Sequence, residues 1–180
     1  GFVFQSQCFQ KGDTVPDFTL YQSNGEAFNL RDELLKGKPV LLMAGSYTCN
    51  VFRPRLTEFN NLVNQYGSLI SFFLVYVVEA HPIIDISPYT TPPGSVWDQV
   101  PGANDDYQFR QPTTYGERKF LVDSLIARLT IDAPVLIDGP CNEWWINYGK
   151  NPNGAFLIAP SGVVYGSNGW FNGSSNGTGI

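Results

Sequence analysis

The stretch "PVLLMAGSYTCNVFRPRLTEFNNLVNQYGSLISFFLVYVV", residues 39–78, contains two apolar runs separated by a segment of helical periodicity. The runs at 39–45 and 70–78 have the near-continuous apolar character of strands that are covered on both faces. Between them, apolar residues recur at the spacing of one helix face, at Phe52, Leu56, Phe59, Val63 and Tyr66. Gly67 ends this pattern. The stretch therefore predicts a strand, a helix over 51–66 and a second strand in one sheet.

The remaining segments extend this sheet. "TVPDFTL" and "EAFNL" flank Asn24-Gly25, a strong turn signal, and predict a hairpin over 15–30. "PVLID" at 134–138 predicts a third buried strand, and "AFLIAP" with "GVVYG" predicts a closing hairpin whose first strand covers 155–159. Helical periodicity returns at Phe120, Leu121, Leu125, Ile126 and Leu129, and "CNEWWINYG" has the pattern of a short helix. Because strands alternate with helices, we expect an α/β fold: a mixed, mainly parallel central sheet flanked by helices in a thioredoxin-like layout.

The chain is expected to form one domain over residues 12–171, preceded by an N-terminal arm at 1–11 and followed by a Gly/Ser/Asn-rich tail at 172–180. A length of 180 residues, with 43% hydrophobic and 15% charged residues, is sufficient for one real core. The proline-rich segment 82–113 is too long for a routine connection. We therefore expect it to carry function or to pack over the sheet.

The first ten residues, "GFVFQSQCFQ", carry no charge and include three phenylalanines. A solvated arm of this composition would expose apolar surface, so we expect it to dock. It either folds back as an extra strand on its own sheet, fixed through Cys8, or adds a strand to the open edge of a neighbouring subunit. The second arrangement would build a homo-oligomer, or a filament if the contacts do not close.

Charge and composition exclude several classes of partner. The formal net charge is -5 at pH 7 and the sequence pI is about 4.7, with no lysine or arginine cluster, which excludes nucleic acid and anionic membrane surfaces. No apolar stretch approaches the roughly 20 residues of a membrane-spanning helix, so we expect a soluble chain. One histidine and three scattered cysteines give no metal-ligand spacing, and no cofactor is implied. Trp144 and Trp145 are expected to be core and surface aromatics rather than a ligand site.

The ends of the chain bear on its location. It begins at Gly1 rather than methionine, so we expect that an N-terminal segment has been removed, and secretion is one explanation. Glycosylation sequons begin at Asn172 and Asn176 in the tail. Together these features predict an extracellular or secreted protein. In such an oxidising compartment, Cys8 and Cys141 could form a structural disulfide that ties the arm to the domain.

Cys49 lies where the first buried strand ends and the long helix begins, with Asn50 as the expected N-cap. A thiolate there would feel the positive end of the helix dipole and the unpaired amides of the first turn, and both lower a thiol pKa. Thr48 offers a hydroxyl, and Arg53 or Arg55 adds positive charge. If Cys49 is reactive, we therefore expect its pKa to lie below the value of a free cysteine, about 8.5. The alternative is a small buried side chain at a strand–helix junction.

Two quoted stretches carry a family resemblance. "GDTVPDFTLYQSNGEAFNLRDELLKGKPVLLMAGSYTC" resembles the N-terminal half of redoxin and peroxiredoxin-type proteins. "GSYTCNVFRPRLTEFNNLVNQYGSLISFFLVYVVEAHP" is similar to the iodothyronine deiodinases and their bacterial deiodinase-like relatives. The resemblance covers about residues 12–169. It implies a thioredoxin fold, with Cys49 at the selenocysteine position, Thr48 beside it, and Glu79 and His81 at the acid/base positions.

The sequence also departs from this family pattern. Cysteine in place of selenocysteine leaves a less acidic and less nucleophilic group at position 49. Phe52 stands where a Cys-x-x-Cys motif has its second cysteine, so dithiol exchange is not expected. "KNPNGAFLI" lies where a thioredoxin has its cis-proline loop, and the isomer of Pro152 stays open.

Two interpretations of the site follow. His81 is either the general acid/base beside Cys49 or a hydrogen-bonding cap at a strand end. Glu79 either orients His81 or is a solvated strand-end carboxylate. In the first case, Cys49 and His81 meet at the carboxyl edge of the sheet, within direct or water-bridged reach, in a thiol-dependent oxidoreductase that acts on a small-molecule or thiol substrate. In the second case, the chain is a secreted structural or self-assembling subunit, or a non-catalytic binding module, that keeps the fold.

Overall fold

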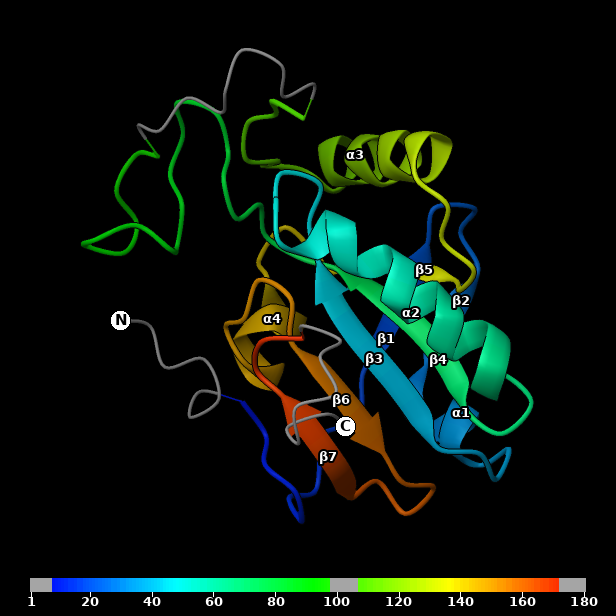
Figure 1. The fold of residues 1–180 in the computed structure, drawn as a ribbon. Coiled ribbons are helices and arrows are strands. Elements are labelled where there is room, and N and C mark those ends of the chain that lie inside the picture. Colours follow the sequence, from blue (N-terminus) through cyan, green and yellow to red (C-terminus); the bar gives the residue numbers. More distant parts are fainter. Residues whose placement is uncertain (1–7, 98–106, 172–180) are drawn as a thin grey trace.

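The structure is a computed structural model that describes residues 8–97 and 107–171. Within them, four helices flank a seven-stranded sheet of order β2-β1-β5-β4-β3-β6-β7 (Figure 1). The strands are β1 (Thr19–Gln22), β2 (Ala27–Asn29), β3 (Val40–Gly45), β4 (Ser71–Tyr76), β5 (Val135–Ile137), β6 (Ala155–Ile158) and β7 (Val164–Asn168). β3, β4 and β5 run parallel, and the other neighbours pair antiparallel. The predicted mixed sheet is confirmed, but the expectation that it is mainly parallel is wrong, because β1 and β6 both pair antiparallel with the central parallel strands.

Helices cover both faces of this sheet. They are α1 (Leu30–Leu34), α2 (Phe52–Tyr66), α3 (Tyr115–Arg128) and α4 (Glu143–Tyr148). Alternate residues of β3 point to opposite faces, so Leu41 and Met43 pack with α2 and α3. Val40 and Leu42 pack with α1, α4 and the chain that leads into β1. Figure 1 shows α2 lying across the front of the sheet and α4 behind it. The helix predicted over 51–66 is confirmed in this position.

The start of α2 differs from the prediction. Asn50 is exposed, and the N-cap position belongs to Val51, which makes no side-chain cap hydrogen bond. The sulfur of Cys49 instead accepts the N–H of Phe52 at 3.4 Å. The prediction of Asn50 as N-cap is therefore wrong, because the preceding side chain already reaches the first helical turn.

α3 begins five residues before the first apolar residue of its predicted pattern. Thr114 and Glu117 form a capping box: the threonine side chain accepts the Glu117 N–H, and the glutamate side chain accepts the Thr114 N–H. The sequence Thr-x-x-Glu is the usual signal for such a start. Apolar periodicity alone does not detect it, because the first turn of the helix is polar.

The segment 82–113 forms a long excursion from the sheet. Its described parts, 82–97 and 107–113, contain no helix or strand and one isolated bridge, between Ile86 and Val96. Figure 1 shows them extending beyond the ends of β3 and β4. The described cis peptide bond is Thr91–Pro92, so the bond before Pro152 is trans.

The described part of the N-terminal arm lies on its own domain. Cys8 is buried, and the ring of Phe9 packs edge-on against Tyr148 with centroids 5.4 Å apart. Farther along, Thr14 forms a bridge to Val163, next to β7. Residues 8–14 therefore fold back on the chain that carries them.

Some sequence predictions fall outside the described residues. They are the docking of residues 1–7 and the glycosylation of Asn172 and Asn176. Assembly through the arm and an extracellular location stay predictions. Among the described helices, none combines the length and the apolar character required to cross a membrane.

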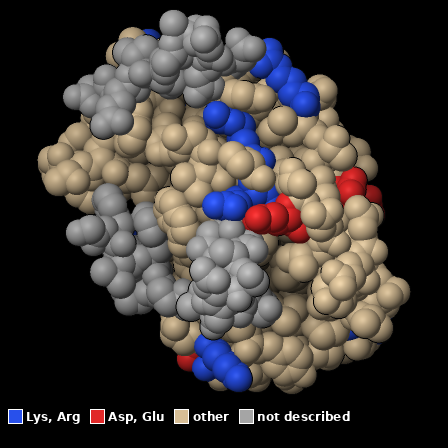
Figure 2. Space-filling view, in the orientation of Figure 1, with Lys and Arg blue, Asp and Glu red and all other residues tan. Residues whose placement is uncertain are grey.

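Figure 2 shows how charge is distributed on the face that carries α2. On the described part of this face, basic side chains stand apart from one another or beside acidic ones. On α2 itself, Arg55 and Glu58 form an ion pair at 3.4 Å. Charge on this part of the surface is mixed rather than gathered in one broad patch.

Candidate active site

Two chain segments meet at the carboxyl edge of the sheet. β3 leads into Thr48 and Cys49, and the chain after β4 leads through Glu79 to His81. Because β3 and β4 are parallel neighbours, both segments leave the sheet at the same edge. Ser46 joins them, since its hydroxyl oxygen accepts the N–H of the residue after Glu79 at 3.1 Å. The four residues that the sequence singled out therefore come together.

Glu79 is a fully enclosed polar group of this edge. Its side chain is 0% exposed, and both carboxyl oxygens accept hydrogen bonds. Thr48 donates twice to Oε2, from its N–H at 2.8 Å and from its hydroxyl at 2.7 Å. The hydroxyl of Tyr76 donates to Oε1. The interpretation of Glu79 as a solvated carboxylate is therefore wrong, because the chain beyond Tyr76 stays inside the fold.

Burial sets the protonation of this pair. It raises the pKa of Glu79 above the ordinary value, against the hydrogen bonds from Tyr76 and Thr48 and the charge of Arg118, which lower it. Burial and the neighbouring carboxylate raise the pKa of Tyr76 well above its ordinary value. The phenol therefore keeps its proton and is the donor to Glu79.

His81 lies beside Thr48, the residue before Cys49. Its backbone N–H donates to the Thr48 hydroxyl oxygen at 3.0 Å, and its ring Nδ1 lies 3.2 Å from the Thr48 carbonyl oxygen. A carbonyl oxygen accepts only, so Nδ1 carries a proton and is the donor in this contact. The ring also packs against Trp97, with centroids 4.4 Å apart. These contacts fit the capping interpretation, and they also fix the imidazole at the edge that holds Cys49.

Cys49 is fully buried at the start of α2. Burial raises the pKa of its thiol, while the N–H groups of Phe52 and Val51 lower it. The charge of Glu79 raises the pKa further, and that of Arg53 lowers it. The prediction of a lowered pKa is therefore wrong for this conformation, because desolvation outweighs the helix terminus. The resting group at neutral pH is a thiol.

Gln111 attaches the segment 82–113 to this edge through hydrogen bonds. The Gln111 Oε1 accepts the N–H of Glu79 at 2.8 Å, and its Nε2 donates to the Glu79 carbonyl oxygen at 2.9 Å. The same Nε2 donates to the carbonyl oxygen of Ile86 at 3.0 Å. The Gln111 side chain thus links the backbone at Glu79 to the long segment 82–113.

The first turn of α2 is tied to the same excursion. Arg53 donates to the carbonyl oxygen of Tyr47 at 2.7 Å, and its guanidinium lies 3.9 Å from the ring centroid of Tyr107. The ring of Tyr47 stacks on Phe109 with centroids 4.9 Å apart. Arg53 therefore contributes the positive charge that the sequence assigned to Arg53 or Arg55.

Phe52 occupies the place of a second active-site cysteine and has a packing role. It is fully buried, and a Cβ atom added to Gly45 would overlap its ring. The other cysteines of the described chain lie elsewhere: Cys8 is buried and Cys141 is exposed. Within the described residues, no disulfide joins Cys8 to Cys141, so the bridge that the sequence allowed is not formed. No group of three or more metal-ligating side chains occurs in the described part of the chain.

Sequence reasoning missed Tyr76 and Gln111. Tyr76 lies inside an apolar run, where it reads as core, and its signal is a hydroxyl three residues before Glu79. Gln111 lies in a segment without periodicity, and the sequence gives no indication that its amide would pair with the backbone of Glu79.

Comparison with known proteins adds a family to this geometry. The chain matches the family model described as iodothyronine deiodinase over residues 3–174. The type I iodothyronine deiodinase of Xenopus laevis is 24% identical over 159 residues, which cover 86% of this chain and 55% of that protein. The thyroxine 5-deiodinase of Sparus aurata is 37% identical over 65 residues, which cover 33% of this chain and 24% of that protein. The chain thus spans about half the length of the Xenopus protein.

Solved structures give the fold. A thiol:disulfide interchange protein DsbE from Chlorobium tepidum superposes with a TM-score of 0.60 at 18% identity, over 89% of this chain and 85% of that one. The exposed lipoprotein thioredoxin of Streptococcus pneumoniae gives a TM-score of 0.55 at 16% identity, over 85% and 88% of the two chains. The predicted thioredoxin-like fold is confirmed.

Proposed function

Because this chain belongs to the iodothyronine deiodinase family, we propose that it is a thiol-dependent oxidoreductase in which Cys49 is the single nucleophile. The observation that carries the proposal is the pair of hydrogen bonds made by the Thr48 hydroxyl, to Glu79 and from the His81 N–H. They hold the carboxyl group of Glu79 and the backbone of His81 next to the residue that precedes the thiol, and the His81 ring Nδ1 contacts the Thr48 carbonyl oxygen. A nucleophile with an oriented base nearby is the usual arrangement for covalent catalysis.

The chemistry follows from this arrangement. The thiolate is the nucleophile, so the thiol must first lose its proton, and Nε2 of His81 accepts it. Cys49 then attacks the electrophilic atom of an oxidised or halogenated small molecule. The leaving group departs with the bonding electron pair and receives that proton. One thiol from solution then displaces the group bound to Cys49, and a second releases the resulting mixed disulfide and restores the Cys49 thiol. Glu79 and Tyr76 position Thr48 and, through it, the imidazole.

Substrate access requires the covering segment to move. Cys49 is 0% exposed, and Tyr107 and Phe109 of the long segment pack against the hydrophobic cluster that contains it. Opening this cover admits water to the sulfur and removes the desolvation that raises its pKa. The amides of the first turn of α2 remain and lower the pKa. The thiol is thus protected at rest and activated when a substrate displaces the cover.

The test measures reduction of an aryl disulfide and of an iodinated phenol, with dithiothreitol as the reductant. Cys49→Ser is expected to lower kcat/KM by about 10³-fold or more. Cys141→Ser is the matched control, because Cys141 is exposed and lies outside the network, and it should retain wild-type activity. Turnover by Cys49→Ser at the wild-type rate would reject the nucleophile. Absence of turnover in every variant, with a folded protein, would favour the structural-subunit alternative.

A further inference from the structure

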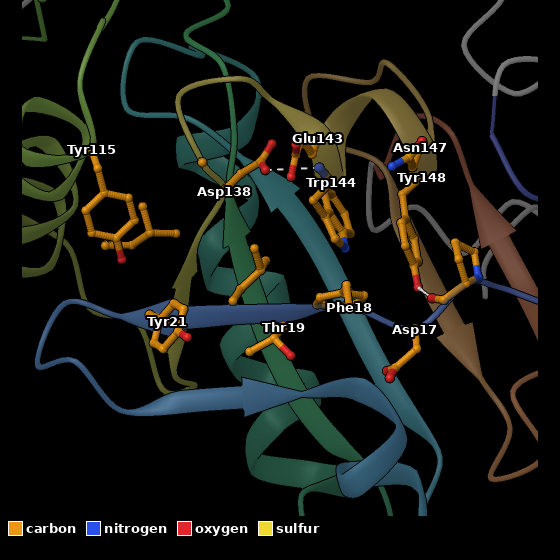
Figure 3. Close-up of a pocket in the computed structure, with 14 residues that line it drawn as sticks. Asp17, Phe18, Thr19, Tyr21, Tyr115, Asp138, Glu143, Trp144, Asn147 and Tyr148 are labelled. Atoms are coloured by element: carbon orange, nitrogen blue, oxygen red, sulfur yellow. Dashed lines mark hydrogen bonds between the residues drawn. The ribbon is translucent and has the colours of Figure 1, made fainter.

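A cavity of about 430 Å³ lies between β1, the chain after β5, and the starts of α3 and α4 (Figure 3). Five aromatic side chains contribute to its wall: Phe18, Tyr21, Tyr115, Trp144 and Tyr148. The cavity includes none of the residues of the Cys49 site. Its volume is in the range of sites for small molecules.

The charged side chains that line this cavity are acidic, although Arg118 and Arg31 lie near two of them. Three carboxyl groups line it, from Asp17, Asp138 and Glu143, and none of its lining residues is lysine or arginine. Figure 3 shows the carboxyl groups of Asp138 and Glu143 close together at one end and Asp17 at the other. An organic cation inside would therefore meet acidic groups at both ends.

The three carboxyl groups differ in their hydrogen bonds and in their exposure. Both oxygens of Asp138 accept backbone N–H groups of α4, from Trp144 at 3.0 Å and Trp145 at 3.1 Å, so this group is structural. Asp17 and Glu143 are exposed at the rim. Burial acts to raise the pKa of Asp17, but hydrogen bonds from Asn29 and from backbone N–H groups outweigh it and lower the pKa below its ordinary value. Asp17 is therefore ionised at neutral pH.

An indole group inside the cavity has an unused donor. Trp144 is 3% exposed, and its Nε1 has no hydrogen-bond partner among the described residues. Its ring stacks on Tyr148 with centroids 4.8 Å apart, and Figure 3 shows the nitrogen end of the indole turned toward Phe18 within the ring of lining residues. A buried N–H without a partner is costly, so it indicates an acceptor that is supplied from outside.

We infer that this cavity binds an organic cation with an aromatic body, whose ammonium group lies among the aromatic faces beside Glu143, since both oxygens of Asp17 already accept hydrogen bonds, and whose oxygen atom accepts the Trp144 N–H. Aromatic faces attract ammonium groups, most strongly where water is excluded. The carboxylates at the rim add charge attraction, and the apolar wall takes the body of the ligand. The inference is independent of Cys49, because the cavity and the thiol site share no residue.

Binding of three probes with the same ring tests the charge requirement. They are tyramine, the neutral para-ethylphenol and the anionic para-hydroxyphenylpropionate, measured by isothermal titration calorimetry on the full chain. Tyramine should bind saturably and at least about fivefold more tightly than para-ethylphenol, and the anion should bind most weakly. Equal affinity for the three probes, or no saturable binding up to about 10 mM tyramine, would overturn the inference.

Variants locate the binding. Glu143→Gln should weaken tyramine about threefold or more and leave para-ethylphenol unchanged. Glu26→Gln, which changes an exposed glutamate outside the cavity, is the matched control and should have no effect. Equal effects of the two variants would reject the site, and thermal unfolding of each confirms that it is folded.

The Trp144 hydrogen bond has its own test. The wild-type chain should bind tyramine more tightly than phenethylamine, which lacks the oxygen, and this preference should vanish in Trp144→Phe. A preference that persists in Trp144→Phe would overturn the role of the indole. Cys49→Ser should bind all probes like the wild type, so failure of the catalytic proposal and failure of this inference are separate results.

Discussion

Thr48 donates both its backbone N–H and its hydroxyl to the same carboxyl oxygen of Glu79, at 2.8 and 2.7 Å. The hydroxyl oxygen also accepts the N–H of His81 at 3.0 Å. One threonine side chain thus links the residue before Cys49 to two residues that follow β4. All of these groups are buried or half-buried, so water does not readily replace a lost partner.

Thr48→Val keeps the shape of the side chain and removes this link. It leaves the Oε2 of Glu79 with one donor fewer and the His81 N–H without its acceptor, so we expect a loss of about 1–3 kcal/mol in the free energy of unfolding. Thr48→Ser keeps the hydroxyl and is the matched control. Urea denaturation of the two variants measures the difference. If both are equally stable, the hydroxyl does not hold the site together.

Glu79→Gln tests the buried carboxyl group through pH. Because burial raises the pKa of Glu79, the native state binds more protons than the unfolded state between about pH 4.3 and the native pKa. The stability that Glu79 contributes is therefore fully present below about pH 4.3 and is lost as the pH rises through the native value. We expect the advantage of the wild type over Glu79→Gln in unfolding free energy to shrink as the pH rises from about 4.

The control for this experiment is Glu58→Gln, which alters a partly exposed ion pair on α2. The difference in unfolding free energy between Glu58→Gln and the wild type should not shrink as the pH rises from about 4. If the wild-type advantage over Glu79→Gln instead grows with pH, Glu79 has a lowered pKa in the folded protein and the account of its protonation is wrong.

His81→Asn separates the two interpretations of the histidine. The Asn side-chain NH₂ can replace the Nδ1–H that reaches the Thr48 carbonyl oxygen, but nothing replaces Nε2. As a general acid/base, His81 is worth about 10²–10⁴-fold in rate, so kcat/KM should fall by that factor with little change in unfolding free energy. If His81 is only a hydrogen-bonding cap, His81→Asn should instead keep the wild-type kcat/KM.

Gly45→Ala tests the packing that replaced a second cysteine. The added methyl group would overlap the ring of Phe52, and overpacking of this kind costs about 1–3 kcal/mol. Gly139→Ala is the control, because an added Cβ there meets no atom within 4 Å. Thermal unfolding should show a clear loss for the first variant and a small change for the second. Equal melting temperatures would mean that Phe52 moves aside without cost.

The fold was predictable because its signals are local. The apolar runs that became β3 and β4 and the periodicity that became α2 depend on neighbours within each segment. The N-cap of α2 was predicted wrongly because the sulfur of Cys49, rather than the side chain of Asn50, accepts the first-turn N–H. The start of α3 was missed because polar capping residues carry no apolar pattern.

The candidate site was predictable in position and not in electrostatics. Strand ends place Cys49 and His81 at one edge, and this follows from the sequence order of parallel strands. The raised pKa of Cys49 depends on how the assembled fold buries the thiol. Tyr107 and Phe109, which pack against the cluster that contains Cys49, lie about 60 residues away from it along the chain. Burial of this kind is a property of the assembled fold, and no local pattern at position 49 reveals it.

The central claim is that Cys49 forms the covalent adduct, and one measurement tests it directly. Cys141→Ser protein, which lacks the exposed thiol, is mixed with an aryl disulfide without reductant, quenched after one turnover and mapped by peptide mass spectrometry. The account predicts one equivalent of released aryl thiol and one aryl adduct, located on Cys49. Release of the aryl thiol with Cys49 unmodified and the adduct on Cys8 would contradict it.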